Sequence, residues 1–174
     1  MAGNHLACRA LRRLRDIDLG RELVLREREF QCDNFGFGEA MIIGLGTDIV
    51  EVPRIAKMIT DHGDHFLESV FTPGEIAHCQ PRRDPTPHYA GRWAAKEAVM
   101  KVLGTGFTTD VGWTEIEIKV KPSGQPYIEL HGKTHSFADR MGVKEILITI
   151  SHTSNYATAT AIGIGDDLGN PQMG

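Results

Sequence analysis

Apolar side chains in residues 41–164 recur first at the spacing of a strand and then at that of a helix. The apolar run that opens at Met41 predicts a strand to about Leu45. From Pro53, a residue suited to a first helical turn, apolar positions repeat three and four apart until Gly63 interrupts them. We therefore expect a short strand and then a helix that ends at this glycine.

Two further helices are expected in the next part of the chain. The sequence "TPGE", residues 72–75, is a capping box with proline at the first helical position, and it predicts a short helix that ends before the proline-rich "PRRDPTP". A longer helix is expected over about His88–Leu103, because apolar and small residues repeat at helical spacing and Gly104 can end the last turn.

The remaining elements are two strand pairs with a helix between them. "WTEIEIKVK" alternates strictly between apolar and other residues, "PSGQP" is a turn sequence, and "YIEL" supplies the partner strand of a hairpin. After a helix near Lys133–Met141, "KEILITI", the turn "SHTSN" and "YATATAIGI" predict a buried strand and a closing strand. Consecutive strands joined by tight turns predict an α+β fold, an antiparallel sheet packed by helices.

Three segments differ in composition along the chain. Residues 1–40 hold seven arginines and seven acidic residues and end in the glycine-rich "NFGFGEA". We expect them to be a poorly ordered N-terminal extension, with Met41 as the functional start. Residues 41–164 are the expected folded domain, and residues 165–174, "GDDLGNPQMG", have the composition of a disordered tail.

Charge and cysteine content exclude several classes of protein. The formal net charge of -4 lacks the basic excess of general nucleic-acid-binding proteins. The three cysteines, Cys8, Cys32 and Cys79, are odd in number and not closely spaced, so neither a disulfide framework nor a zinc knuckle is expected. No apolar run approaches the ~18 residues of a membrane span, and the N-terminus lacks a secretory signal. These features predict a cytoplasmic protein without nucleic-acid or membrane partners.

The longer helix has two predicted polar stripes. With residues placed at steps of about 100°, the core face consists of Ala94, Ala95, Ala98, Val99 and Val102. Arg92 and Lys96 share one polar stripe, and Glu97 and Lys101 share the other. The common explanation for such a Glu–Lys pair is an exposed ion pair worth only ~0.3–0.5 kcal/mol. Taken alone, the pair indicates a solvated helix face.

Further candidates lie near the ends of two predicted strands. Asp48 follows Gly44 and Gly46, which would let a ligand come close, although a strand-end or capping role is commoner. The sequence "GLGTDI" is neither a dinucleotide fingerprint nor a P-loop, since it lacks the third glycine and the lysine. His152 lies in the turn "SHTSN", where a purely structural histidine is equally expected.

The last candidate is the loop after the longer helix, with Gly104, Thr105 and Gly106 in "GTGF". The loop can simply end the helix, or it can bring backbone N–H groups toward phosphates. Two carboxylates, a lysine and a glycine-rich loop suit Mg²⁺ held beside a polyphosphate. From spacing alone, Mg²⁺-dependent phosphoryl chemistry is the most specific function indicated.

These motifs together resemble one known family. The segments "IGLGTDIVEVPRI", "FTPGE", "YAGRWAAKEAVMKVLGTG" and "ITISHTSNYATATA" occur in the order and at the spacing of the holo-[acyl-carrier-protein] synthases, the short bacterial-type 4'-phosphopantetheinyl transferases. The resemblance covers about Met41–Ile164. It implies an enzyme of fatty acid biosynthesis that moves 4'-phosphopantetheine from coenzyme A to a serine of apo acyl carrier protein, releasing adenosine 3',5'-bisphosphate.

The resemblance also implies roles for individual residues. Asp48 and Glu97 would bind Mg²⁺ beside the coenzyme A pyrophosphate, and Lys101 would contact phosphate and assist the leaving group. His152 would lie near the coenzyme A site, and the loop Gly104–Gly106 would form part of the nucleotide pocket.

Partners and assembly follow from the same resemblance. Arg54, with Met58 one turn further on, would meet an acidic helix of the carrier protein. Val50 stands where the larger transferases have a second acid, so the chain resembles the short type, which is a homotrimer with its active sites at subunit interfaces.

Three alternatives remain open from the sequence. The acceptor can instead be a carrier domain of a polyketide or peptide synthetase. A Mg²⁺-dependent nucleotide phosphohydrolase would use the same acids but would release phosphate without an acceptor protein. A non-catalytic module that binds carrier proteins or coenzyme A is disfavoured, because both acids are intact.

Overall fold

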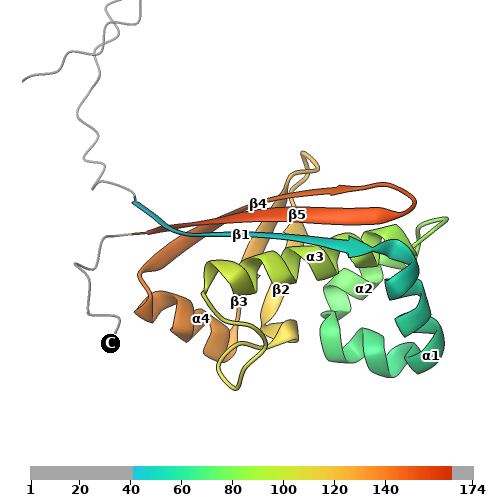
Figure 1. Cartoon of the computed structure of the whole chain (residues 1–174), viewed down its shortest axis with the longest axis horizontal. Helices are drawn as coiled ribbons and strands as arrows, with labels where there is room; N and C mark the ends of the chain where they lie inside the picture. Colours follow the sequence, from blue (N-terminus) through green and yellow to red (C-terminus); the bar gives the residue numbers. More distant parts are fainter. Residues whose placement is uncertain (1–40, 166–174) are drawn as a thin grey trace, which may run out of the picture. The chain divides into compact units, whose positions relative to one another are not determined.

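The computed structural model describes residues 41–165 and confirms the α+β architecture, with antiparallel strands packed by helices (Figure 1). The predicted extension, residues 1–40, and residues 166–174 of the predicted tail lie outside the described residues, whereas Gly165, the first residue of that tail, is the last residue of a strand. Within the described part of the chain, no helix is both long and apolar enough to cross a bilayer.

The strands form two antiparallel sheets. The larger sheet has the order β1-β5-β4, and its strands are β1 (Met41–Glu51), β5 (Tyr156–Gly165) and β4 (Val143–His152). The predicted hairpin of β2 (Ile116–Val120) and β3 (Pro126–Leu130) forms the smaller sheet. Because β5 is central in the larger sheet, the first and last strands of the domain lie side by side.

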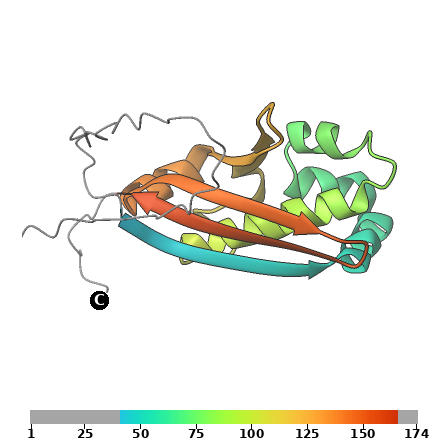
Figure 2. The same ribbon diagram turned by 90° about the horizontal axis from the view of Figure 1, so that it is seen from above.

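The helices pack on one side of the larger sheet (Figures 1 and 2). α3 (Thr86–Val102) runs along that face, and α1 (Val52–Val70) and α2 (Pro73–Cys79) lie toward one end of it. A 3-10 turn, η1 (Trp113–Glu115), leads into β2, and α4 (Gly132–Arg140) connects β3 to β4. The predicted capping box at the start of α2 is confirmed by hydrogen bonds in both directions between Thr72 and Glu75.

Small residues allow α3 to lie close to the sheet. The central strand contributes three buried alanines, Ala157, Ala159 and Ala161. On β1, a Cβ atom on Gly46 would overlap the carbonyl oxygen of Ala98, and one on Gly44 would overlap that of Val102. The two glycines therefore make room for the helix, and the prediction that they make room for a ligand is wrong.

One predicted boundary is wrong, and another is correct but incomplete. β1 continues to Glu51 because it pairs with β5 along its whole length, so Asp48 lies within the strand. The first helical run of α1 ends at Gly63 as predicted, because a φ of 55° and a ψ of -138° are not helical, but a second, unpredicted run follows across this kink and continues to Val70. The apolar residues beyond the bend, including Phe66 and Val70, are buried, and this burial stabilises the second part of the helix.

No described element covers the other face of the larger sheet. Leu45 on β1, Ile162 on β5 and Leu147 on β4 form an apolar row across it. Leu45 is 65% exposed and Ile49 is 68% exposed. The strand predicted from "KEILITI" is therefore buried on one face only. We call this surface the open sheet face.

Candidate active site

Asp48, Glu97 and Lys101 form a charged centre between β1 and α3. Lys101 Nζ lies 2.9 Å from Asp48 Oδ1 and donates a hydrogen bond of 2.6 Å to the carbonyl oxygen of Thr47. The Asp48 side chain is only 18% exposed, because it points toward α3 at the point where Gly46 lets the helix approach. We call these three residues the acid–lysine centre.

The pKa of Glu97 responds to the charge of Asp48. Burial raises the pKa of Glu97, and the negative charge of Asp48 raises it further. Lys101 and Arg54 lower the same pKa but do not cancel the increase. A partly buried carboxylate beside a second carboxylate attracts a further cation. Glu97 is therefore coupled electrostatically to Asp48 on the neighbouring strand as well as to Lys101 on its own helix.

The loop after α3 leaves space beside this centre. Gly104 has φ 67°, a conformation that favours glycine, and no atom of residues 41–165 lies within 4 Å of the Cβ position of Gly104 or Gly106. The Thr105 hydroxyl is buried without a hydrogen-bond partner in the described residues, while its N–H donates to the carbonyl oxygen of Met100 at 3.0 Å. The loop therefore has room beside its two glycines, and its buried hydroxyl has no partner among the described residues.

His152 lies apart from the acid–lysine centre, at the end of β4. Its ring packs edge-on against His88, with the ring centroids 4.9 Å apart. It lines a pocket of about 290 Å³ together with His78, Arg82 and Arg92, and apolar side chains complete the walls. None of the described residues that line this pocket is acidic. We call it the basic pocket.

Arg92 is the residue of this pocket that sequence patterning placed wrongly. The pattern put it on a polar stripe, yet the residue is only 6% exposed, and its Nε atom has no hydrogen-bond partner in the described residues. A buried guanidinium with an unused donor, in a pocket without carboxylates, favours an anionic ligand. No local pattern indicated this role, because the pocket depends on α2, α3, β2 and β4 coming together.

Neighbouring positive charges also act on the histidines around the pocket. Burial lowers the pKa of His78, and the charges of Arg92 and Arg82 lower it further. Burial lowers the pKa of His88 as well, followed by the effects of His152 and the same arginines, while Asp84 opposes them. A bound anion would offset this repulsion.

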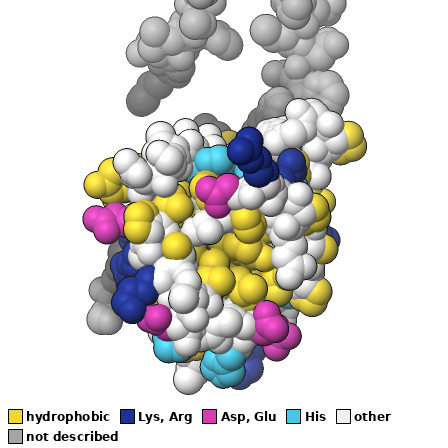
Figure 3. Space-filling view, turned by 90° about the vertical axis from the view of Figure 1, so that its right-hand side faces the viewer, with side chains coloured by type: hydrophobic (Ala, Val, Ile, Leu, Met, Phe, Trp, Pro, Cys, Tyr) yellow, Lys and Arg dark blue, Asp and Glu magenta, His cyan; other side chains and the backbone are white. Residues whose placement is uncertain are grey.

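The residues expected to meet a partner lie on α1. Arg54 is exposed, and Met58 is partly buried against the core. Lys57 is paired with Asp61 at 2.7 Å, so it adds little free charge beside Arg54. On the side of the molecule where α1 lies in Figure 1, hydrophobic side chains gather centrally, with charged and histidine side chains around them (Figure 3).

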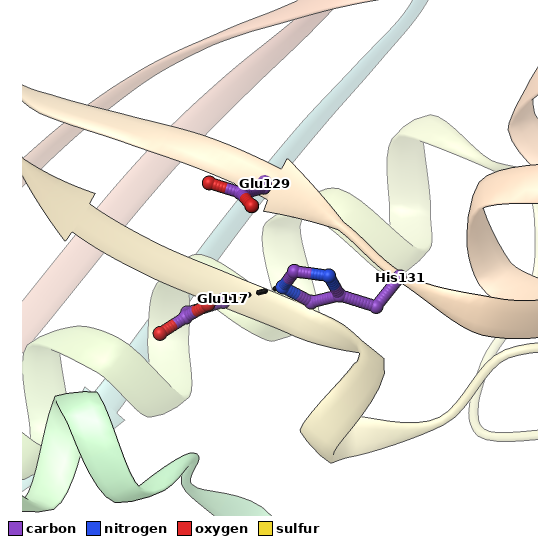
Figure 4. Close-up of side chains that lie close together, drawn as sticks. All are labelled: Glu117, Glu129 and His131. Atoms are coloured by element: carbon purple, nitrogen blue, oxygen red, sulfur yellow. Dashed lines mark hydrogen bonds and ion pairs between the residues drawn. The ribbon is translucent and has the colours of Figure 1, made fainter.

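A second group of possible metal ligands lies on the hairpin and was not predicted. Glu117, Glu129 and His131 bring ligand atoms within 4.8 Å of one another (Figure 4). However, Lys119 Nζ already lies 2.7 Å from Glu129 Oε2 and 3.5 Å from Glu117 Oε2. This hairpin cluster therefore has a cationic partner of its own.

Comparison with known proteins agrees with the geometry. Residues 44–161 match the model of the 4'-phosphopantetheinyl transferase superfamily. The holo-[acyl-carrier-protein] synthase of Koribacter versatilis is 44% identical over 122 residues, covering 70% of this chain and 98% of that protein. The protein of the same name from Chlamydia pneumoniae is 44% identical over 123 residues, covering 71% and 98%.

Solved structures show the same relationship. The holo-[acyl-carrier-protein] synthase of Neisseria meningitidis has a TM-score of 0.67 and 28% identity, covering 71% of this chain and 98% of that one. The Helicobacter pylori enzyme, solved in complex with coenzyme A, has a TM-score of 0.62 and 29% identity, covering 68% and 98%. The chain belongs to the holo-[acyl-carrier-protein] synthase family of the 4'-phosphopantetheinyl transferase superfamily, the short type with one copy of the fold.

Proposed function

We propose that this chain transfers 4'-phosphopantetheine from coenzyme A to a serine of apo acyl carrier protein, with Mg²⁺, in the cytoplasm and in support of fatty acid biosynthesis. The observation that carries the proposal is the acid–lysine centre, in which Asp48, Glu97 and Lys101 come from two elements and meet at one point. Two relatives that match this chain over 98% of their own length are named holo-[acyl-carrier-protein] synthase, after this activity.

The acid pair suits Mg²⁺. Oxygen ligands are the donors that this ion prefers, and the charge of Asp48 lies close enough to Glu97 to raise its pKa. When bound, Mg²⁺ would neutralise negative charge on the pyrophosphate of coenzyme A. The hairpin cluster is the weaker candidate, because Lys119 already neutralises its two glutamates.

The reaction joins the serine Oγ to the β-phosphorus and breaks the bond from that phosphorus to the oxygen of adenosine 3',5'-bisphosphate. Lys101 can donate a hydrogen bond to the departing phosphate, since its ammonium group reaches the same point as the Asp48 carboxylate. The serine must also lose its proton. We assign this proton to a water held by Asp48, the carboxylate nearest to the lysine.

The basic pocket suits another anionic group of coenzyme A, such as its 3'-phosphate. It offers Arg82, Arg92 and His152 without a competing carboxylate in its lining. However, the pocket and the acid–lysine centre do not face each other in one chain. Arg92 and Glu97 are five positions apart on α3, which places them about 140° apart around the helix.

A homotrimer would resolve this separation. The open sheet face exposes Leu45, Ile49 and Leu147, as a surface between subunits would. Contact between copies through this face would bring the basic pocket of one subunit beside the acid–lysine centre of the next. We therefore propose active sites shared between subunits, with the α1 surface around Arg54 and Met58 left free for the carrier protein.

The decisive experiment is intact-protein mass spectrometry of an apo acyl carrier protein incubated with this enzyme, coenzyme A and Mg²⁺. We expect a gain of one phosphopantetheine that is lost when EDTA is added. Asp48→Asn and Glu97→Gln should each lower the rate at least ~10²-fold, the scale of losing one charge-stabilising group. Glu129→Gln, in the hairpin cluster, should leave the rate within about twofold.

Two results would refute the proposal. One is the absence of any mass gain with folded wild-type enzyme. The other is loss of the Mg²⁺ response in Glu129→Gln with full activity in both acid-pair variants, which would move the metal to the hairpin cluster.

A further inference from the structure

Lys96 is a buried charge that neither the acid–lysine centre nor the basic pocket uses. Its side chain and that of Glu75 are both 0% exposed, and Lys96 Nζ lies 2.8 Å from Glu75 Oε2. Taking two charges out of water costs several kcal/mol per ion, so a buried ion pair is weak evidence for stability. A pair buried this completely, next in sequence to Glu97, calls for another explanation.

The ammonium group of Lys96 is bonded in three directions. Besides Glu75, it donates to the carbonyl oxygen of Trp113 at 2.7 Å and to that of Ile116 at 2.5 Å. An ammonium group has three donors, so all of them are used. The partners lie on α2, on η1 and at the start of β2, and α3 is therefore held from three sides.

Glu75 is itself fixed in place. Its Oε2 accepts a hydrogen bond of 2.8 Å from the N–H of Thr72, and its Oε1 accepts one of 3.2 Å from the N–H of Ile118. Burial lowers the pKa of Lys96, while the charge of Glu75 raises it and favours the ammonium form. The network thus joins the capping box of α2 to β2 and ends on the helix that carries Glu97.

This anchoring affects the site because Lys96 and Glu97 are successive residues of one rigid helix. Their side chains leave α3 about 100° apart, so a rotation of the helix about its axis moves both together. At the helix surface, about 5–6 Å from the axis, a rotation of roughly 10° displaces a carboxylate by about 1 Å. A misplacement of that size can lower a rate by ~10²-fold.

Most other contacts of α3 are less suited to fixing its rotation. Ala94, Ala98 and Val99 are fully buried, but apolar contacts are non-directional. The close approach to Gly44 and Gly46 sets the distance between α3 and β1. The hydrogen bonds of Lys96, by contrast, depend on direction as well as distance.

We propose that Lys96 is a positioning residue, whose ion pair with Glu75 and bonds to two backbone carbonyls fix the rotation of α3 and thereby place the Glu97 carboxylate beside Asp48. The inference rests on the proposed role of Glu97 as a Mg²⁺ ligand. It makes a distinct prediction, because Lys96 itself never touches metal or substrate.

The test compares Lys96→Met with Val99→Ala, which removes apolar contacts from the same buried helix but no directional bond. Mn²⁺ binding is followed by electron paramagnetic resonance with coenzyme A present, together with Tm and kcat for apo acyl carrier protein. We expect Lys96→Met to weaken Mn²⁺ binding at least fivefold and lower kcat about 10²-fold. Val99→Ala should bind Mn²⁺ within twofold of wild type. Unchanged Mn²⁺ binding in folded Lys96→Met would overturn the inference.

The double variant Glu75→Gln/Lys96→Met separates positioning from stability, and it serves as the main test if Lys96→Met alone does not fold. It leaves no unpaired buried carboxylate, so its Tm should exceed that of the single variant. Its Mn²⁺ binding should nevertheless stay weak. Recovery of both Tm and Mn²⁺ binding to wild-type values would show that the pair is structural only.

Failure of the proposed function is distinguishable from failure of this inference. Wild-type enzyme that binds no Mn²⁺ and transfers without a divalent ion would refute the function. Metal-dependent wild-type enzyme, with unchanged Mn²⁺ binding in folded Lys96→Met, would refute only the positioning role.

Discussion

Glu97 carries a charge that the fold itself disfavours. Because burial and Asp48 raise its pKa, the folded protein holds a proton on Glu97 more readily than the unfolded chain does. By linkage, ionised Glu97 lowers the free energy of unfolding. This penalty is absent below the unfolded pKa of about 4.3, grows as pH rises toward the raised folded pKa, and is complete above it.

Replacing Glu97 should therefore stabilise the protein while inactivating it. We expect Glu97→Gln to have a higher Tm than wild type at pH 8 without divalent ions, and the difference should shrink toward pH 4.5. Thermal unfolding followed by circular dichroism across this range measures the effect. Glu68→Gln, which removes an exposed charge from α1, is the control and should shift Tm little at any pH. A lower Tm for Glu97→Gln at every pH would contradict the assignment.

Gly46 permits the contact that places Asp48 beside α3. A methyl group on Gly46 would overlap the carbonyl oxygen of Ala98, and backbone there cannot yield easily. Gly46→Ala should therefore lower stability by about 1–3 kcal/mol, the usual cost of overpacking, and reduce kcat by moving Asp48. Chemical denaturation and transfer assays measure both effects. For stability, Gly106→Ala is a matched control, because its Cβ would meet nothing within 4 Å. Equal stability of the two variants would argue against the close contact.

For individual residues, the sequence predicted those that belong to a local motif. It missed those whose burial depends on partners elsewhere in the chain. Asp48, Glu97 and Lys101 were recognisable from their motifs, and the structure brings them together. Arg92 and Lys96 were assigned to a polar stripe, yet both are buried. Helical periodicity reports one helix face, whereas a buried charge is explained only by groups on α2 and β2 that come from elsewhere in the chain.

At the scale of elements, the bend in α1 depends on the conformation of Gly63 and not on crowding. Its φ of 55° is one that residues with a side chain rarely adopt, although no atom lies within 4 Å of its Cβ position. Gly63→Ala should therefore cost roughly 1–2 kcal/mol from backbone strain alone. Denaturant unfolding measures this cost. Exposed Ser69→Ala, in the same helix, is the comparison, and a neutral Gly63→Ala would show that the bend relaxes.

The types and order of the elements were predictable because each has its own periodicity. The hairpin, the capping box and the four helices follow from local patterns, and the structure confirms them. The pairing of β1 with β5 could not be predicted from local patterns, since it joins residues more than a hundred positions apart, such as Asp48 and Ala159. The length of β1, and hence the place of Asp48 within it, is fixed by that pairing.

At the scale of the whole molecule, the open sheet face is organised as rows across three strands. Thr47 pairs with Thr160, which pairs with Thr149, and the hydroxyl oxygens of the first two lie 3.3 Å apart. The next row along is apolar, with Leu45, Ile162 and Leu147 in register. Alternating apolar and hydroxyl rows can give a contact between subunits both affinity and register. Periodicity could not reveal this face, because it predicted a fully buried strand.

A shared active site makes a prediction that a single-chain site does not. If the basic pocket of one subunit serves the acid–lysine centre of the next, Asp48→Asn and His152→Ala destroy different halves of each site. Asp48→Asn alone should be at least ~10²-fold less active than wild type. His152→Ala alone should be clearly impaired. Co-expressed in one cell, they should form mixed trimers in which some interfaces combine two intact halves.

We therefore expect the co-expressed mixture to regain a substantial fraction of wild-type activity, well above the sum of the separate variants. Native mass spectrometry confirms the trimer and its mixed composition. Leu45→Glu, which places a charge on the open sheet face, should yield folded monomers and abolish the recovery, because no interface remains. Mixed trimers without any gain in activity would mean that both halves of each site come from one chain.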